Sequence, residues 1–409
     1  MTSKRRSALR RARTSQLALA SLLTFGVALP SALAQSTPSS APATQPVKEP
    51  LRSHLSRWPF LSKIPITFSG YFWVDGGYMQ RTNAKAGQFD QGSAYMQGRF
   101  VLAAEHYQEW GSLYTKARAE VIAFVNEYTK SQFEPHILDA YVELGQSWWD
   151  IRAGRFLGWE SYHRGAGIEL FTAEEAGALG GPALYWLQLA RGYKDEAGQI
   201  AVHLYPWKHL SIEVAGVYGQ ESNQNNYGVR PVVAFNYGGF TALGGYEFLT
   251  QQPQTEADKT KTTTHGFTGQ LRYKLSIVTA GANFGRATRD AIDIQGLVDS
   301  EKTFDEWISV GGFVNLDFWR NAIGLGYHYT YQKNRQGEQN SHQQAFVSYL
   351  FRLPIKGLAL KAVYGFARAH IQDVDVNDEW NNTMHTARLR IVYDPSHLMD
   401  LLVYSPGKR

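Results

Sequence analysis

The sequence predicts an all-β chain that forms a transmembrane antiparallel β-barrel. Apolar and polar residues alternate in one segment after another between residues 65 and 394, with the period of two that is typical of strands. Charged residues occupy the polar faces, and no helical layer is available to cover the apolar ones. A closed barrel pairs every backbone group, turns its apolar face to lipid and its polar face to a water-filled lumen.

The N-terminus has the three parts of a secretory signal peptide. A basic start precedes the apolar residues 17–30, which are too few to span a bilayer comfortably, and a small-residue cleavage site ends at Ala34. We expect cleavage after Ala34, and a single membrane anchor is the alternative. Residues 35–64 are expected to form a flexible periplasmic tether, and residues 65–409 the outer-membrane barrel.

Composition narrows the class of protein further. The formal net charge of +5 comes largely from basic residues of the signal segment, so it indicates no nucleic-acid partner. Cysteine is absent, which excludes disulfides, and the mature chain has no apolar run long enough for a membrane-spanning helix. The aromatic share of 13% suits the interfacial girdles of a membrane barrel, with a stacking track for sugars as the alternative.

Alternation and turn chemistry predict seventeen strands joined by short turns and longer polar loops in alternation. The number is odd, whereas bacterial single-chain barrels have an even number of strands. We favour eighteen strands, with residues 167–172 as a further strand. The alternative is sixteen, with two segments merged and residues 158–182 as a long loop. The predicted strands are 66–80, 93–107, 110–126, 136–145, 147–157, 183–193, 198–206, 209–220, 228–237, 239–250, 265–275, 276–287, 304–317, 319–332, 341–353, 356–371 and 382–394.

Two segments resemble the bacterial outer-membrane porin superfamily, and most of all its phosphate-selective porin O/P-like group. In residues 139–156 (DAYVELGQSWWDIRAGRF), a strand ends in an aromatic hairpin and leads to a second strand, which in that family precedes a loop folded into the pore. Residues 205–216 (YPWKHLSIEVAG) are similar to the family's short periplasmic hairpins. The resemblance implies passive transport of small hydrophilic solutes, without a cofactor. It also implies a Gram-negative outer membrane, contact with its lipid bilayer and lipopolysaccharide, and often a homotrimer.

The resemblance places a pore-narrowing loop at residues 158–181. Acidic side chains there, opposite basic wall residues, would create a transverse field that sorts polar solutes. An outer loop with ordinary solvated charges is the alternative. The candidate constriction residues are Trp159, Glu160, His163, Arg164, Glu169, Glu174 and Glu175.

Charged residues of both signs fall on the predicted inward faces. We expect a salt-bridged wall of mixed sign, and a basic ring that selects anions such as phosphate is the alternative. The residues predicted to line the lumen are Arg99, Lys116, Arg118, Glu120, Asp139, Glu143, Asp150, Arg152, Arg272, Arg388 and Arg390.

Signals for other functions are weak. Asp373, Asp375, Asn377 and Glu379 offer oxygen ligands that suit Ca²⁺, but the EF-hand pattern is absent and we expect a hydrated loop instead. No metal, cofactor or enzymatic activity is predicted, because nucleophile, phosphate-loop and zinc motifs are missing. We expect a passive porin. The alternatives are a selective channel for anions or oligosaccharides, and a plugged structural or adhesive barrel.

Overall fold

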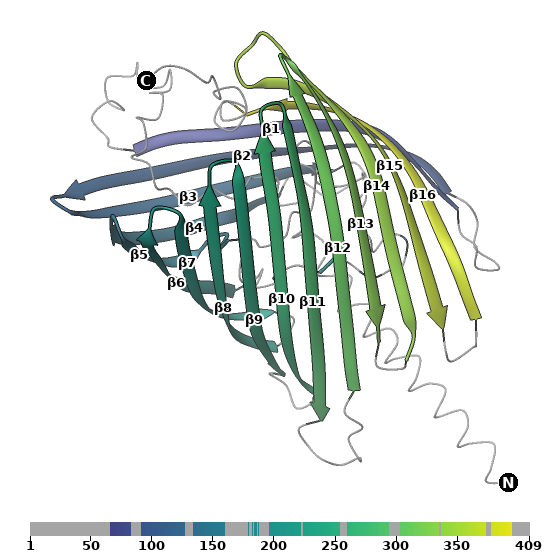
Figure 1. Cartoon of the computed structure of the whole chain (residues 1–409), viewed down its shortest axis with the longest axis horizontal. Helices are drawn as coiled ribbons and strands as arrows, with labels where there is room; N and C mark the ends of the chain where they lie inside the picture. The colour runs from purple at the N-terminus through teal and green to yellow at the C-terminus, as the bar shows by residue number, and fades with distance from the viewer. Residues whose placement is uncertain are drawn as a thin grey trace. The chain divides into compact units, whose positions relative to one another are not determined.

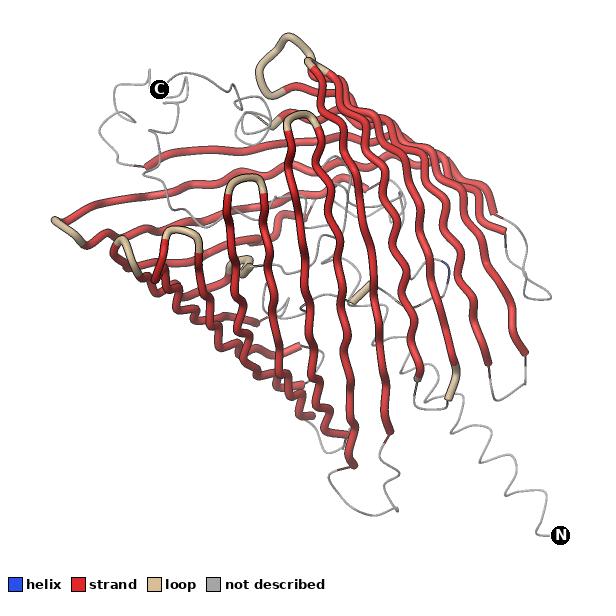
Figure 2. Tube along the Cα trace, in the orientation of Figure 1, coloured by secondary structure: helices blue, strands red, loops and turns tan. Residues whose placement is uncertain are grey.

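The structure is a computed structural model. It describes residues 66–82, 91–126, 134–159, 179, 182, 184, 185, 187, 196–221, 224–253, 260–293, 303–334, 337–373 and 378–394. The predicted signal peptide and tether lie outside these residues. Every regular element of the described part is a strand (Figure 2). No helix that could cross a bilayer occurs there.

Sixteen strands make up the described part of the chain. Their bounds are β1 (Ile66–Thr82), β2 (Gln91–Trp110), β3 (Leu113–Asn126), β4 (Glu134–Gln146), β5 (Trp149–Arg155), β6 (Glu196–Trp207), β7 (Leu210–Glu221), β8 (Gln224–Tyr237), β9 (Phe240–Pro253), β10 (Thr260–Leu275), β11 (Val278–Asp293), β12 (Thr303–Phe318), β13 (Asn321–Lys333), β14 (Gln339–Arg352), β15 (Leu358–Asp373) and β16 (Asp378–Tyr393).

The strands close into one antiparallel barrel (Figure 1). Each strand pairs with its neighbours in sequence, and the first pairs with the last in a ladder from Phe72 opposite Tyr393 to Thr82 opposite Thr383. Because the number of strands is even, β1 begins and β16 ends at the same rim, which also carries the short turns. No strand edge is left unpaired in this ring, which is what a lipid environment requires.

The barrel confirms the prediction of an all-β antiparallel fold. It has sixteen strands, which was the alternative number, so the preferred number of eighteen was wrong. Sixteen of the seventeen predicted segments coincide with strands, and no two of them merge. The predicted strand 183–193 is wrong where it is described, because Leu184, Tyr185 and Leu187 lie outside any strand. These apolar residues have the spacing of a strand but pack inside the barrel instead. The predicted strand 167–172 lies outside the described residues.

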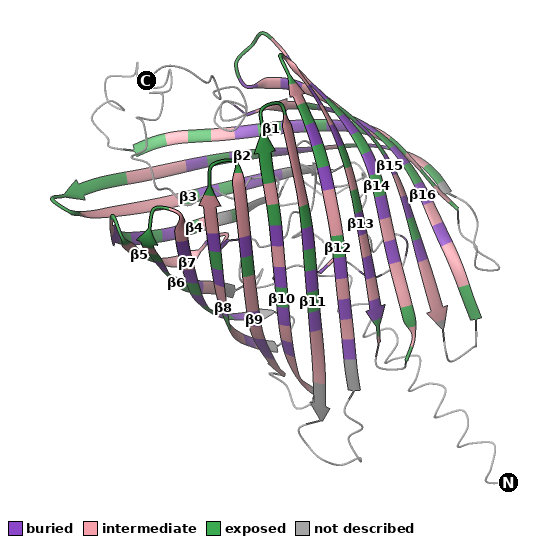
Figure 3. Ribbon diagram, in the orientation of Figure 1, coloured by how far each residue is buried: buried purple, intermediate pink, exposed green. Residues whose placement is uncertain are grey.

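Burial alternates along the strands, as the colours of Figure 3 show. On β16, Thr386, Arg388 and Arg390 are buried, whereas Leu389 and Ile391 between and beyond them are exposed. The outward face is therefore apolar and the inward face polar, which suits lipid outside and polar solutes inside.

Exposed tryptophans mark the rim of the short turns. Trp110, Trp148, Trp207 and Trp319 are all more than half exposed and lie at strand ends or in the turns between them. Trp319 has a φ of 52°, a left-handed conformation that closes the tight β12–β13 turn. Such a ring of indoles is the arrangement that membrane interfaces favour.

A charged residue on the outward face should destabilise the barrel, and the loss should be larger near the middle of the membrane than near its surface. Leu325 is 54% exposed on β13, and we expect Leu325→Arg to lower the free energy of unfolding from vesicles by about 2–4 kcal/mol. The control is Gln343→Arg on β14, nearer the long loops, where the same charge should cost about 0–1 kcal/mol. Urea titration of both variants measures the difference, and equal losses would contradict an outward face in lipid.

Candidate functional site

A buried ionic cluster joins the inward faces of β5 to β8. Nδ1 of His203 lies 2.5 Å from Oδ1 of Asp150, and Nε2 lies 2.8 Å from Oε2 of Glu213. The guanidinium of Arg230 contacts the other oxygen of Glu213 at 2.7 Å, and the Tyr205 hydroxyl donates to Asp150 at 2.8 Å. An imidazole that donates from both nitrogens is positively charged. Two cations then balance two carboxylates, as burial requires.

This cluster holds the chain just after β5. The main-chain N–H of Trp159 donates to Glu213 at 3.0 Å, and its carbonyl accepts from Nη1 of Arg230 at 3.0 Å. Its indole stacks on His203, with 5.2 Å between the ring centroids. A Cβ atom at Gly158 would come within 1.7 Å of the Arg230 guanidinium, so the close approach depends on glycine.

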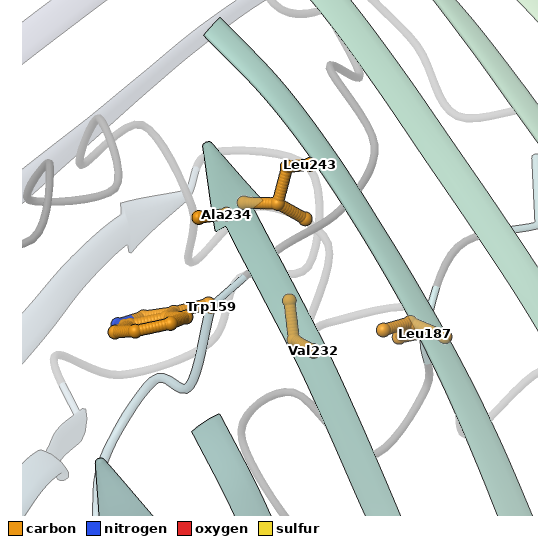
Figure 4. Close-up of a cluster of buried hydrophobic side chains, with 5 residues drawn as sticks. All are labelled: Trp159, Leu187, Val232, Ala234 and Leu243. Atoms are coloured by element: carbon orange, nitrogen blue, oxygen red, sulfur yellow. The ribbon is translucent and has the colours of Figure 1, made fainter. Parts of the chain in front are cut away.

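An apolar cluster reinforces the same attachment. The side chains of Trp159 and Leu187 pack against Val232 and Ala234 of β8 and Leu243 of β9 (Figure 4). Leu187 is completely buried, although it belongs to no strand. The chain between β5 and β6 therefore begins and returns at one side of the inner wall.

Between these two points the chain reaches the far wall. Leu179 is completely buried against Ala367 and Ala369 of β15 and Met384 of β16, and its carbonyl accepts from the amide of Asn382 at 3.0 Å. In the ring of sixteen strands, β8 and β16 are opposite each other. Trp159 and Leu187 thus lie against one wall, and Leu179, which is between them in sequence, lies against the opposite wall.

Tyr185 fixes the returning part of this chain. Its hydroxyl donates to Glu247 of β9 at 2.6 Å, and its main-chain N–H donates to Ser309 of β12 at 2.9 Å. Its ring packs against Ala287 and Trp307, on β11 and β12. Glu247 and Ser309 lie near the middle of their strands, so Tyr185 is within the barrel and not at its mouth.

The lumen wall formed by β2 to β5 carries paired charges of both signs. Lys116, Arg118 and Arg152 each have a carboxylate within ion-pair distance on the same or a neighbouring strand, so their charges are compensated. The pairs are Lys116–Glu105 (2.9 Å), Arg118–Glu105 (3.3 Å), Arg118–Glu120 (2.6 Å) and Arg152–Glu143 (2.7 Å).

A second buried cluster lies where the barrel closes. Asp75 of β1 accepts from the guanidinium of Arg390 through both of its oxygens and lies 3.5 Å from Arg388. The amide of Gln97 also donates to Asp75, at 3.2 Å. The Arg390 guanidinium stacks 3.9 Å above the Trp73 ring.

The wall formed by β10 to β14 differs in kind. Its buried polar residues are uncharged except for Asp305 and Arg352. Arg352 pairs with Asp317 at 2.6 Å. The lumen therefore has a charged side and a side of hydroxyl, amide and imidazole groups. The uncharged residues are Thr264, Thr268, Gln270, Asn283, Ser309, Asn315, His328, Thr330, Gln332, His342, Gln344 and Ser348.

The predicted lumen residues fall into two groups by burial. Arg99, Glu120, Glu143, Asp150, Arg388 and Arg390 are buried, and Lys116, Arg118, Asp139, Arg152 and Arg272 are partly buried.

Of the predicted constriction residues, Trp159 is described. Glu160, His163, Arg164, Glu169, Glu174 and Glu175 lie outside the described residues.

The Ca²⁺ candidate is only partly described. Asp375 and Asn377 lie outside the described residues, and Asp373 and Asp378 pair at the end of the β15–β16 hairpin. Glu379 is exposed and lies 3.8 Å from His370. Residues 66–394, where described, contain no group of acidic, histidine and cysteine side chains that could hold a metal ion.

Sequence reasoning missed the residues at the centre of both buried clusters. Asp75, His203 and Arg230 alternate with outward apolar residues, so parity alone could have placed them inward. Their partners could not have been found in this way, since Asp75 and Arg390 are 315 positions apart.

Comparisons with known proteins place the fold. No protein-family model and no curated relative matches the chain. The structure matches the outer-membrane channel DcaP of Acinetobacter baumannii (TM-score 0.54, 13% identity, covering 80% of this chain and 97% of that one). It also matches an anion-selective porin from Comamonas acidovorans (TM-score 0.52, 14% identity, 80% and 99%).

A third match is OmpT, an outer-membrane protein of Vibrio cholerae solved in a trimer form (TM-score 0.51, 12% identity, 80% and 100%). All three matches have low identity and cover almost the whole of the solved protein, so the likeness is one of architecture. The chain has the fold of the bacterial outer-membrane porins.

Proposed function

We propose that this protein is an outer-membrane porin, a passive channel for small hydrophilic solutes and ions. The observation that carries the proposal is a closed barrel with an apolar outer face and a polar inner face, crossed by a chain anchored on both walls. A barrel with this number of strands has a lumen wide enough for an aqueous path. Such a channel needs no cofactor or energy source.

The chain between β5 and β6 sets the size limit of the channel. It is attached at Trp159 and Leu187 to one wall and at Leu179 to the other, which divides the lumen. The predicted constriction residues Glu160, His163, Arg164, Glu169, Glu174 and Glu175 belong to this same segment. Their charges would face solutes that pass the crossing.

The wall charges favour weak ion selectivity. Lumen cations pair with carboxylates on β2 to β5, and Arg230 pairs with Glu213. Paired charges produce a small net potential but a strong local field, which orients polar solutes more than it excludes one sign of charge. We therefore favour a general channel over an anion-selective one.

Location and assembly follow from the same proposal. Export by the predicted signal peptide, insertion into a Gram-negative outer membrane and a homotrimeric state are expected. They are supported by the basic and apolar N-terminus and by the trimer form of the Vibrio cholerae protein. Cross-linking in membranes would test the oligomer.

A plugged, non-conducting barrel is the second candidate. The complete burial of Leu179 and Leu187, together with Tyr185, favours it, because the crossing chain fills part of the lumen. The two candidates differ in a single measurement, which is ion flow through the purified barrel.

The mature chain, residues 35–409, should conduct when it is reconstituted into a planar bilayer. We expect stepwise openings, and a reversal potential close to zero under a tenfold salt gradient because the wall charges compensate each other. A large reversal potential of the sign given by anion flow would overturn weak selectivity. A folded but silent barrel would favour the plugged candidate.

Weakening the attachment at Trp159 should widen the channel. Glu213→Gln leaves the Arg230 guanidinium without its carboxylate, which costs about 3–5 kcal/mol for a buried pair. We expect a higher mean conductance and more current noise, since the crossing chain is released at one end. The matched control is Asp317→Asn, which breaks the Arg352 pair away from the crossing chain. Unchanged conductance in a folded Glu213→Gln barrel would argue against a constriction at this segment.

A further inference from the structure

Two Tyr–His pairs with nearly the same geometry lie on the outward face of the barrel. In each, a tyrosine hydroxyl lies 2.8 Å from Nδ1 of a histidine on the next strand. In each, a phenylalanine two residues after the tyrosine places its ring 5.2 Å from the imidazole. The pairs are Tyr246–His265 on β9 and β10 and Tyr364–His385 on β15 and β16.

The two pairs differ in the cation beside them. Arg368, two residues beyond Phe366, donates twice to the amide oxygen of Asn381, at 3.1 and 3.2 Å. Because this acceptor is neutral, the arginine keeps its full charge. Near the other pair, the outward-facing Arg286 of β11 lies opposite Phe267 and is neutralised by Glu306 at 2.7 Å. Only the β15–β16 pair thus combines aromatic side chains with an uncompensated positive charge.

Several hydrogen-bond donors converge beside this arginine. A neutral imidazole that accepts at Nδ1 from Tyr364 carries its proton on Nε2, which leaves His385 free to donate outward. Across the strand pairs, Gln80 of β1 lies opposite His385, and Arg368 lies opposite Thr383, two residues from His385. Arg368, His385 and Gln80 are all exposed. Guanidinium, imidazole and amide groups together suit a phosphate.

An apolar hollow of about 510 Å³ adjoins these donors on the side of the short turns. Its floor consists of small residues, Gly76, Ala362 and Ala387, and its walls include Tyr349, Tyr364 and Leu389. Tyr364 belongs both to this wall and to the Tyr–His pair. The surface therefore has a polar, cationic end and an apolar end in direct continuity.

We propose that this outward surface of β1, β15 and β16 binds one anionic membrane lipid that carries a phosphate, with the phosphate between Arg368 and His385 and an acyl chain in the hollow. The polarity of the surface matches that of a lipid from headgroup to chain, and its positive charge is complementary to the phosphate. The inference rests on the proposed function only in placing the outward face in a membrane. It does not require the lumen to conduct.

Native mass spectrometry of the purified mature chain in detergent tests the site. The chain is titrated with phosphatidylglycerol and with phosphatidylcholine of the same acyl chains. We expect tighter binding of phosphatidylglycerol, and about a tenfold loss of that affinity in Arg368→Gln, as for one charge-assisted hydrogen bond. The matched control is Arg286→Gln, which should bind as the wild type does. Equal losses in both variants, or no preference between the lipids, would overturn the proposal.

A second variant tests the apolar end. A Cβ atom at Gly76 meets nothing within 4 Å, so Gly76→Leu is accommodated and fills the hollow. Gly216→Leu on β7, at an equally open glycine, is its control. We expect weaker phosphatidylglycerol binding in Gly76→Leu alone. Unchanged binding there would overturn the proposal, as would displacement of the lipid by millimolar inorganic phosphate, which would indicate a site for the free anion.

Conductance of the same samples separates this proposal from the proposed function. Both lipid-site variants should conduct as the wild type does, because the substituted residues face away from the lumen. A silent wild-type barrel that still prefers phosphatidylglycerol would contradict the channel and support the lipid site. A conducting barrel that shows no preference for phosphatidylglycerol would support the channel and contradict the lipid site.

Discussion

The pairing of β1 with β16 is the constraint on which the rest of the structure depends. An unpaired strand edge in hydrocarbon leaves backbone groups without partners, at several kcal/mol for each group. The ladder from Phe72 to Thr82 removes that edge. Closure also decides which alternate residues of each strand face lipid and which face the lumen, because the same side of the sheet is outward all round the ring. Asp75 and Arg390, at the two ends of the barrel sequence, form an ion pair directly across the closing ladder.

Once parity is fixed, the charged residues have only the lumen available to them. A buried charge without a partner is unfavourable, so the inner wall is stable when each buried cation contacts a carboxylate or an aromatic ring. The pairs on β2 to β5 and the stacking of Arg390 on Trp73 meet this requirement. The wall of β10 to β14 has few buried charges, and its buried Arg352 pairs with Asp317. The division of the lumen into two chemical sides is thus compatible with stability on both.

The strand pattern could be predicted from the sequence because it is local. A period of two identifies strands and faces, and the inward position of Arg388 and Glu143 follows from it. The ends of the strands were harder to predict. β8 begins at Gln224 and β10 at Thr260, because polar residues there still pair beyond the apolar band, where the sequence does not alternate. Residues 183–193 misled the prediction because an apolar run has the same appearance whether it faces lipid or packs inside a barrel.

The partners of the crossing chain could not be predicted, because they depend on closure. Trp159 meets Glu213 and Arg230, and Leu179 meets Met384, only when strands far apart in sequence form one ring. The two attachments also differ in kind. At β6 to β8 the chain is held by charge, whereas at β15 and β16 it is held by apolar packing and one amide hydrogen bond. Salt screens exposed charges strongly but buried pairs much less, and the Arg230 and Glu213 side chains are completely buried. We therefore expect both attachments to persist at high ionic strength.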